Sequence, residues 1–160
     1  MRKTIRIFFF SLLVLLFLNG CNSNDVNDDL FEFKDSFVGD NSGIGNIVNQ
    51  LPSSEYFKGF ELQTKEEPYG MILNYEGIKG EEIEKKYKET AIYNATFIFA
   101  LVQNAEWVTF YFDNNEYKIT KEDLQNWYGK KLSDFTSEDE LRKLTQEYLQ
   151  DESKVNELFK

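Results

Sequence analysis

A stretch of twelve residues in the middle of the chain, 91–102, is apolar on nearly every side and carries no charge. It continues a segment, 81–90, in which Ile83 and Tyr87 stand among charged residues at helical spacing. A helix that is apolar all round has to be buried on every side. We therefore expect one long helix over 81–103, with its second half forming the centre around which the rest of the domain packs.

Alternating segments on either side of this helix predict two β-hairpins. The first joins residues 58–65 to 69–76 through a tip at Glu66 and Glu67. That tip brings apolar residues together in two cross-strand pairs on one face, as a half-buried sheet requires. The expected pairs are Leu62 with Met71 and Phe60 with Leu73.

The second hairpin joins residues 106–113 to 116–120. Asn114 and Asn115 suit a two-residue turn because asparagine tolerates positive φ. This register pairs Phe112 with Tyr117 and Phe110 with Ile119, and it sets Asp113 opposite Glu116. Trp107 and Tyr111 then lie on the face away from the core.

Capping residues and apolar spacing predict further helices after Asp40, after Thr120 (121–128) and after Ser137, with a last turn over 153–160. Residues 30–38 alternate and predict a short extended segment. The order is helix, hairpin, helix, hairpin, helix, helix. This order predicts an α+β domain with a four-stranded antiparallel sheet, built from two hairpins, and helices on one face.

The N-terminus has the features of a secretory signal. Arg2, Lys3 and Arg6 precede an apolar run over 7–18, which ends close to Cys21, the only cysteine. The run is shorter than the roughly 20 residues that span a bilayer, which disfavours an uncleaved transmembrane anchor.

The sequence Leu-Asn-Gly-Cys at 18–21 resembles the lipobox of bacterial lipoproteins. The resemblance implies that Cys21 receives a diacylglyceryl group and that residues 1–20 are removed as a lipoprotein signal peptide. Two acyl chains anchor a protein stably to a membrane. We expect a flexible tether over 21–29 and a single extracytoplasmic domain over 30–160.

Composition narrows the function classes. The chain holds 28 acidic against 18 basic residues, a charge of −10 that becomes −13 without residues 1–20. An acidic surface argues against a nucleic-acid partner, since phosphate contact needs clustered Lys and Arg. With no histidine and one cysteine, catalytic Ser-His-Asp, Cys-His and histidine-zinc sites are excluded. We expect no cofactor and no metal.

Candidate partner-binding residues are the exposed tip residues Glu66, Glu67 and Tyr69, together with Trp107 and Tyr111, because aromatic anchors are enriched at interfaces. The alternative is that Trp107 and Tyr111 pack beneath the C-terminal helices.

Four stretches of the first two thirds of the chain form a recognisable set: residues 38–48 (Val-Gly-Asp-Asn-Ser-Gly-Ile-Gly-Asn-Ile-Val), 51–52, 60–70 and 73–75. Together they resemble the bacterial family catalogued as domain of unknown function 4825. The resemblance covers roughly residues 30–120. It implies a short secreted or lipid-anchored protein of a low-GC Gram-positive bacterium, at the outer face of the cell membrane, and it carries over no catalytic residue.

Three functional hypotheses follow. The first is a lipid-anchored binding, sensory or regulatory domain with a protein or envelope partner. The second is an immunity-type lipoprotein that sequesters a cationic peptide or toxin. The third is a small carboxylate hydrolase of cell-wall polymer, with Glu61, Glu76, Asp113 and Glu116 as candidate acids. The first requires no enzyme activity and is the hypothesis we favour.

Overall fold

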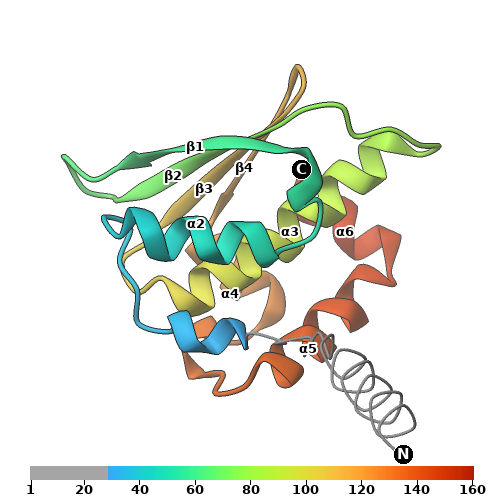
Figure 1. Cartoon of the computed structure of the whole chain (residues 1–160). Helices are drawn as coiled ribbons and strands as arrows, with labels where there is room; N and C mark the ends of the chain where they lie inside the picture. Colours follow the sequence, from blue (N-terminus) through green and yellow to red (C-terminus); the bar gives the residue numbers. More distant parts are fainter. Residues whose placement is uncertain (1–28) are drawn as a thin grey trace, which may run out of the picture.

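The structure, a computed structural model, describes residues 29–160 (Figure 1). The predicted signal peptide, Cys21 and most of the predicted tether lie outside these residues, so those predictions and the domain boundaries stay predictions. Residues 29–160 contain five α-helices, which are α2 (Asn41–Gln50), α3 (Ile83–Leu101), α4 (Lys121–Tyr128), α5 (Glu138–Leu149) and α6 (Glu152–Leu158). The strands are β1 (Phe57–Gln63), β2 (Gly70–Tyr75), β3 (Trp107–Phe112) and β4 (Asn115–Thr120). None of the helices described is both long and apolar enough to cross a membrane.

The four strands form one mixed sheet in the order β1-β2-β3-β4. Each hairpin is antiparallel, but the central strands β2 and β3 run parallel. The α+β class and the four strands are confirmed, and the prediction of a fully antiparallel sheet is wrong.

The length of helix α3 explains the parallel pair. Its 19 residues span about 28 Å, whereas a six-residue strand spans about 20 Å. The helix therefore returns the chain to the end of the sheet at which β2 begins. A strand that follows such a crossover pairs in parallel with the strand before it.

Helix α3 is the buried centre that its composition predicts. Every residue from Thr90 to Leu101 is buried. Figure 1 shows α2 and α3 on one face of the sheet. The strands turn large apolar side chains toward these helices, among them Met71, Leu73, Tyr75, Val108, Phe110, Phe112 and Ile119.

The C-terminal helices pack on α3 and not on the sheet's other face. Tyr128 of α4 reaches the buried Thr96 of α3, with 3.0 Å between the hydroxyl oxygens. Trp127, Tyr128 and Tyr148 form a cluster of edge-to-face rings with centroids 4.8–4.9 Å apart. This arrangement contradicts the alternative that Trp107 and Tyr111 pack beneath these helices.

The first hairpin has the predicted register, with Leu62 paired to Met71 and Phe60 to Leu73. The second is shifted: Phe112 pairs with Asn115, Phe110 with Tyr117 and Tyr111 with Glu116. Asp113 therefore lies in the turn, with φ 52°, and the predicted opposition of Asp113 and Glu116 is wrong.

Contacts outside the hairpin hold Asp113 in this turn. Its carboxylate accepts hydrogen bonds from the Gly77 N–H at 3.1 Å and from the Tyr87 hydroxyl at 3.0 Å. Because the shift is two residues, the same side chains still face the core.

Two terminal segments also differ from expectation. Residues 30–38 are not extended throughout: Leu30–Phe33 form a 3₁₀ helix, η1, whose first turn is capped by the Asp29 carboxylate. The expected last turn is a full helix, α6, because Asp151 caps it through the backbone N–H groups of Ser153 and Lys154.

Candidate functional site

The face of the sheet opposite the helices forms the first candidate surface, and we call it the outer sheet face. Figure 1 shows the described helices on the other side. Thr109 at its centre is buried by its neighbours at 5 % exposure, and its rim is half-buried or exposed. Around Thr109, the strand registers place Glu61, Ile72, Trp107, Tyr111, Glu116 and Lys118.

Trp107 is fixed at one end of this face. Its indole Nε1 donates a hydrogen bond to the Pro68 carbonyl at 2.9 Å. The ammonium of Lys118 lies 5.2 Å from the centre of a Trp107 ring, which is within range of a cation–π interaction. These contacts hold the ring in place, and the side chain is partly exposed.

Tyr111 lies at the other end, four residues along β3. Its hydroxyl donates to the Glu116 carboxylate at 3.2 Å. That hydrogen bond and the charge of Glu116, with a further contribution from Glu61, raise the pKa of Tyr111. The outer sheet face is therefore negative around an aromatic side chain.

A cavity of about 440 Å³ opens where the β1–β2 hairpin tip meets the connection from α3 to β3. We call it the hairpin-end pocket. Glu106 N–H donates to the Tyr69 carbonyl at 2.8 Å and so ties these two segments together. The lining residues are Glu67, Pro68, Tyr69, Asn104 and Glu106.

A third segment, residues 36–38, lies against the connection from α3 to β3. Val38 N–H donates to the Asn104 side chain at 2.8 Å, and Ser36 forms a parallel bridge with Val102. Phe37 lies between Ser36 and Val38 in the chain. Its side chain is 53 % exposed, the most exposed large hydrophobic side chain among residues 29–160.

The structure brings most of the sequence-predicted residues to this pocket. Glu67 and Tyr69 line the pocket, and Glu66 precedes Glu67 at the hairpin tip. Trp107 donates a hydrogen bond to the carbonyl of Pro68, which also lines the pocket. Tyr111 lies apart, roughly 13 Å farther along the strand.

Sequence reasoning missed Asn104 and Glu106, which line this pocket, and the exposed Phe37 in the segment bonded to Asn104. The two segments are 66 residues apart at Val38 and Asn104. No local pattern in the sequence signals such a distant pairing.

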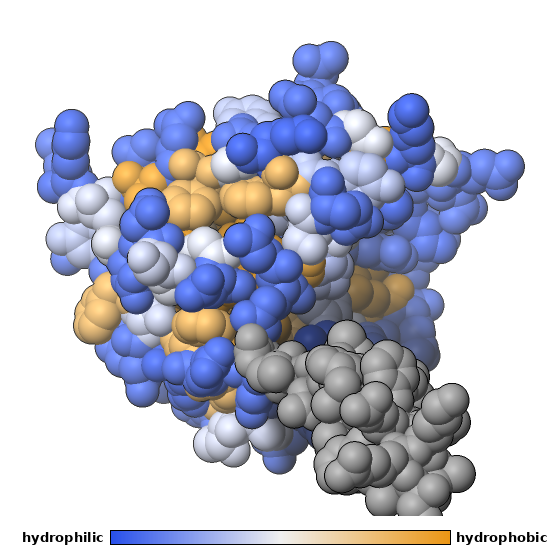
Figure 2. Space-filling view, viewed as in Figure 1, coloured by the Kyte–Doolittle hydropathy of each residue, from blue (hydrophilic) through white to orange (hydrophobic). Residues whose placement is uncertain are grey.

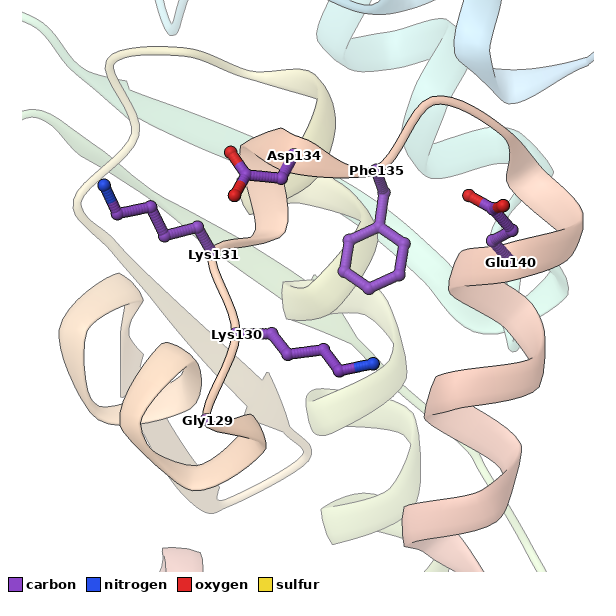
Figure 3. Close-up of a pocket in the computed structure, with 6 residues that line it drawn as sticks. All are labelled: Gly129, Lys130, Lys131, Asp134, Phe135 and Glu140. Atoms are coloured by element: carbon purple, nitrogen blue, oxygen red, sulfur yellow. The ribbon is translucent and has the colours of Figure 1, made fainter.

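Two other cavities lie elsewhere. Figure 3 shows one of about 510 Å³ between the end of α4 and the start of α5, with Lys130 directed toward Phe135. The Lys130 ammonium lies 5.9 Å from the centre of that ring. Two lysines and two carboxylates line this cavity, so its charges balance. The other, of about 470 Å³, lies between α3 and α6.

The hydrophobic surface between β1 and α2 belongs to the core. Figure 2 shows hydrophobic side chains reaching the surface there. Phe57 and Phe60 stack with ring centres 6.2 Å apart, and both pack against buried residues. Gly45 of α2 leaves room for Phe60, so this surface closes the gap between helix and strand.

The candidate hydrolase acids are dispersed. Glu61, Glu76, Asp113 and Glu116 are all exposed, and they line none of the three cavities above. Within 29–160, no group of three or more acidic, histidine or cysteine side chains is placed to hold a metal ion.

Comparison with known proteins assigns most of this architecture to one family. The model of the family described as Domain of unknown function (DUF4825) matches residues 30–122. No curated protein and no solved structure matches. The matched segment contains the outer sheet face and the hairpin-end pocket, whereas the cavity in Figure 3 lies beyond it.

Proposed function

The chain belongs to the DUF4825 family, and from that premise we propose that it is a lipid-anchored extracytoplasmic binding domain. Cys21 carries the diacylglyceryl anchor at the outer face of a bacterial cell membrane. The outer sheet face recognises a protein partner in sensing or regulation.

The composition of the outer sheet face carries the proposal. Protein interfaces combine an apolar or aromatic centre with a polar rim, and Trp and Tyr are enriched among the residues that dominate binding energy. Trp107, Ile72 and Tyr111 supply apolar and aromatic side chains around Thr109, and Glu61, Glu116 and Lys118 supply charged ones. The family match covers all of these residues.

The position at which the chain enters the domain supports the same proposal. Leu30 N–H donates to the Glu138 carboxylate of α5 at 2.7 Å, and the Lys34 ammonium donates to the Ser133 carbonyl at 3.0 Å. The entry thus lies on the helical side, away from the sheet (Figure 1). Residues 22–29 extend at most about 26–29 Å. A lipid on Cys21 would keep this entry point within that distance of the membrane, and the outer sheet face lies on the opposite side of the domain (Figure 1).

The test is an affinity purification from native membranes after mild cross-linking, read by mass spectrometry. Three baits are compared: the wild type, an outer-face variant and a control. The outer-face variant carries Ile72→Ala and Tyr111→Ala, which alter the outer sheet face without changing the buried core. Lys143→Ala and Gln146→Ala, both exposed on α5, form the matched control. The wild type and the control are expected to retain the same partner, and the outer-face variant to lose it.

The anchor is tested in the same preparation. We expect the mass of the N-terminal peptide to show a diacylated Cys21, and Cys21→Ala to release the protein from the membrane. A partner retained equally by all variants contradicts the binding surface, and an unmodified Cys21 contradicts the anchor.

Sequestration of a cationic peptide is a second candidate function, favoured by the charge of the domain. Residues 29–160 hold 26 acidic and 15 basic residues. Exposed charges are screened over about 8 Å at physiological ionic strength. Such binding is therefore expected to weaken steeply with added salt, whereas the apolar and aromatic contacts of the outer sheet face are expected to change little.

A further inference from the structure

We infer that the hairpin-end pocket receives an arginine or lysine side chain from an extended basic segment of the partner. The inference rests on the proposed function, because Trp107 and Pro68 join this pocket to the edge of the outer sheet face.

The walls of the pocket suit a long cationic side chain. Pro68 and Tyr69 supply apolar surface, and Glu67 and Glu106 supply carboxylates. Lysine and arginine lay their methylene stems along apolar surface and keep the charged head at polar groups. A guanidinium can also stack on an aromatic ring while it pairs with a carboxylate.

The pocket carries more negative than positive charge, and this excess favours the binding of a cation. Lys121 lies 3.3 Å from Glu106, but its ammonium also donates to the Gln103 carbonyl at 2.8 Å. Neither Glu66 nor Glu67 takes part in any ion pair within residues 29–160. A basic side chain entering the pocket meets one carboxylate that no lysine of the described chain neutralises.

The neighbouring aromatic side chains extend the site for a segment of several residues. Phe37 precedes Val38, whose N–H binds the pocket residue Asn104, and the Phe37 side chain is 53 % exposed. Trp107 already holds the Lys118 ammonium at 5.2 Å, so its ring faces a cation in the free protein. A segment that runs from the pocket onto the outer sheet face passes this ring.

Intrinsic fluorescence tests the inference, because Trp107 stands at the pocket and the chain has only one other tryptophan. The whole chain in detergent micelles is titrated with two acetylated, amidated peptides, Gly-Ala-Gly-Arg-Gly-Ala-Gly and the same peptide with neutral citrulline in place of arginine. We expect the arginine peptide to bind at least tenfold more tightly. Trp107→Phe should remove the signal, and calorimetry should still detect the binding.

The double variant Glu67→Gln, Glu106→Gln identifies the site. It should weaken binding of the arginine peptide at least tenfold. The control Glu147→Gln, Glu157→Gln removes the same charge from exposed positions of α5 and α6 and should bind as the wild type does.

Three results overturn the inference: equal binding of both peptides, equal weakening by both double variants, or no binding of either peptide. None of these three results contradicts the proposed function if the outer-face variant, Ile72→Ala with Tyr111→Ala, fails to capture the partner. If that variant also captures the partner normally, the proposed function fails as well.

Discussion

The indole ring of Trp107 on β3 lies directly over Gly70 on β2. A Cβ added at Gly70 would lie 2.3 Å from the ring atoms Cδ2 and Cε2 and 2.5 Å from the Trp107 carbonyl oxygen. Glycine at position 70 therefore permits both the close pairing of the two parallel strands and the placement of the outer-face tryptophan.

Gly70→Ala is expected to lower the free energy of unfolding by about 1–3 kcal/mol, the usual cost of overpacking. Denaturant titration measures the loss. Gly39→Ala is the control, because nothing lies within 4 Å of a Cβ there. Adding Trp107→Leu should restore only part of the stability, since the clash with the carbonyl oxygen remains. Equal stability of the Gly70 and Gly39 variants would show that the strands do not approach this closely.

Phe110→Ala tests the core packing beneath the sheet. Phe110 is 0 % exposed, and truncating a buried phenylalanine costs about 3–5 kcal/mol. Phe37→Ala, at a side chain 53 % exposed, should change stability by less than about 0.5 kcal/mol. A loss below about 1 kcal/mol for Phe110→Ala would place β3 with its other face toward the helices.

Stability is expected to fall in alkaline solution because of Tyr128. Burial raises the pKa of Tyr128 from 10.0 to about 12, although the hydrogen bond with Thr96 acts in the opposite direction. Between pH 10 and 12 the unfolded chain loses this proton while the folded protein keeps it, which favours unfolding. A difference of two units corresponds to about 3 kcal/mol.

The comparison with Tyr128→Phe isolates this contribution. The fall in the free energy of unfolding from pH 10 to pH 12 should be about 2 kcal/mol smaller in the variant, since each group is only half titrated at its own pKa. Burial also raises the pKa values of Tyr75 and Tyr87, so some alkaline loss persists in both proteins. Parallel pH profiles for the two would mean that Tyr128 titrates as a solvent-exposed tyrosine does.

Asp113 has two separable roles in the turn of the second hairpin. Its backbone has φ 52°, and its carboxylate accepts hydrogen bonds from Gly77 and Tyr87. Asp113→Ala should cost about 2–3 kcal/mol because it loses the bonds and strains the backbone. Asp113→Gly should cost less, since glycine adopts positive φ freely. If the two variants unfold at the same denaturant concentration, backbone strain makes no contribution.

The elements that local patterns specify were predictable from the sequence. An apolar surface on every side identified the buried half of α3, and Thr120 and Ser137 marked the starts of α4 and α5. The first hairpin kept its register because two apolar pairs, Leu62 with Met71 and Phe60 with Leu73, require the same face.

The features that depend on distant contacts were not predictable. The parallel pairing of β2 and β3 follows from the path of α3 across the sheet, which neither hairpin encodes. Asp113 enters the turn because Gly77 and Tyr87 bind its carboxylate. In the site, aromatic and acidic residues indicated Glu67, Tyr69 and Trp107, whereas no local pattern indicated Asn104, which binds the distant segment 36–38.

The most direct test of the outer sheet face as a binding surface is photo-cross-linking in living cells. A benzophenone amino acid replaces Tyr111 in one strain and the exposed Lys143 of α5 in another. The account predicts a discrete cross-linked species of one mass from position 111, abolished by Ile72→Ala, and none from position 143. Cross-linking from position 143 but not from position 111 would show that the partner binds the helical side, and would contradict the account.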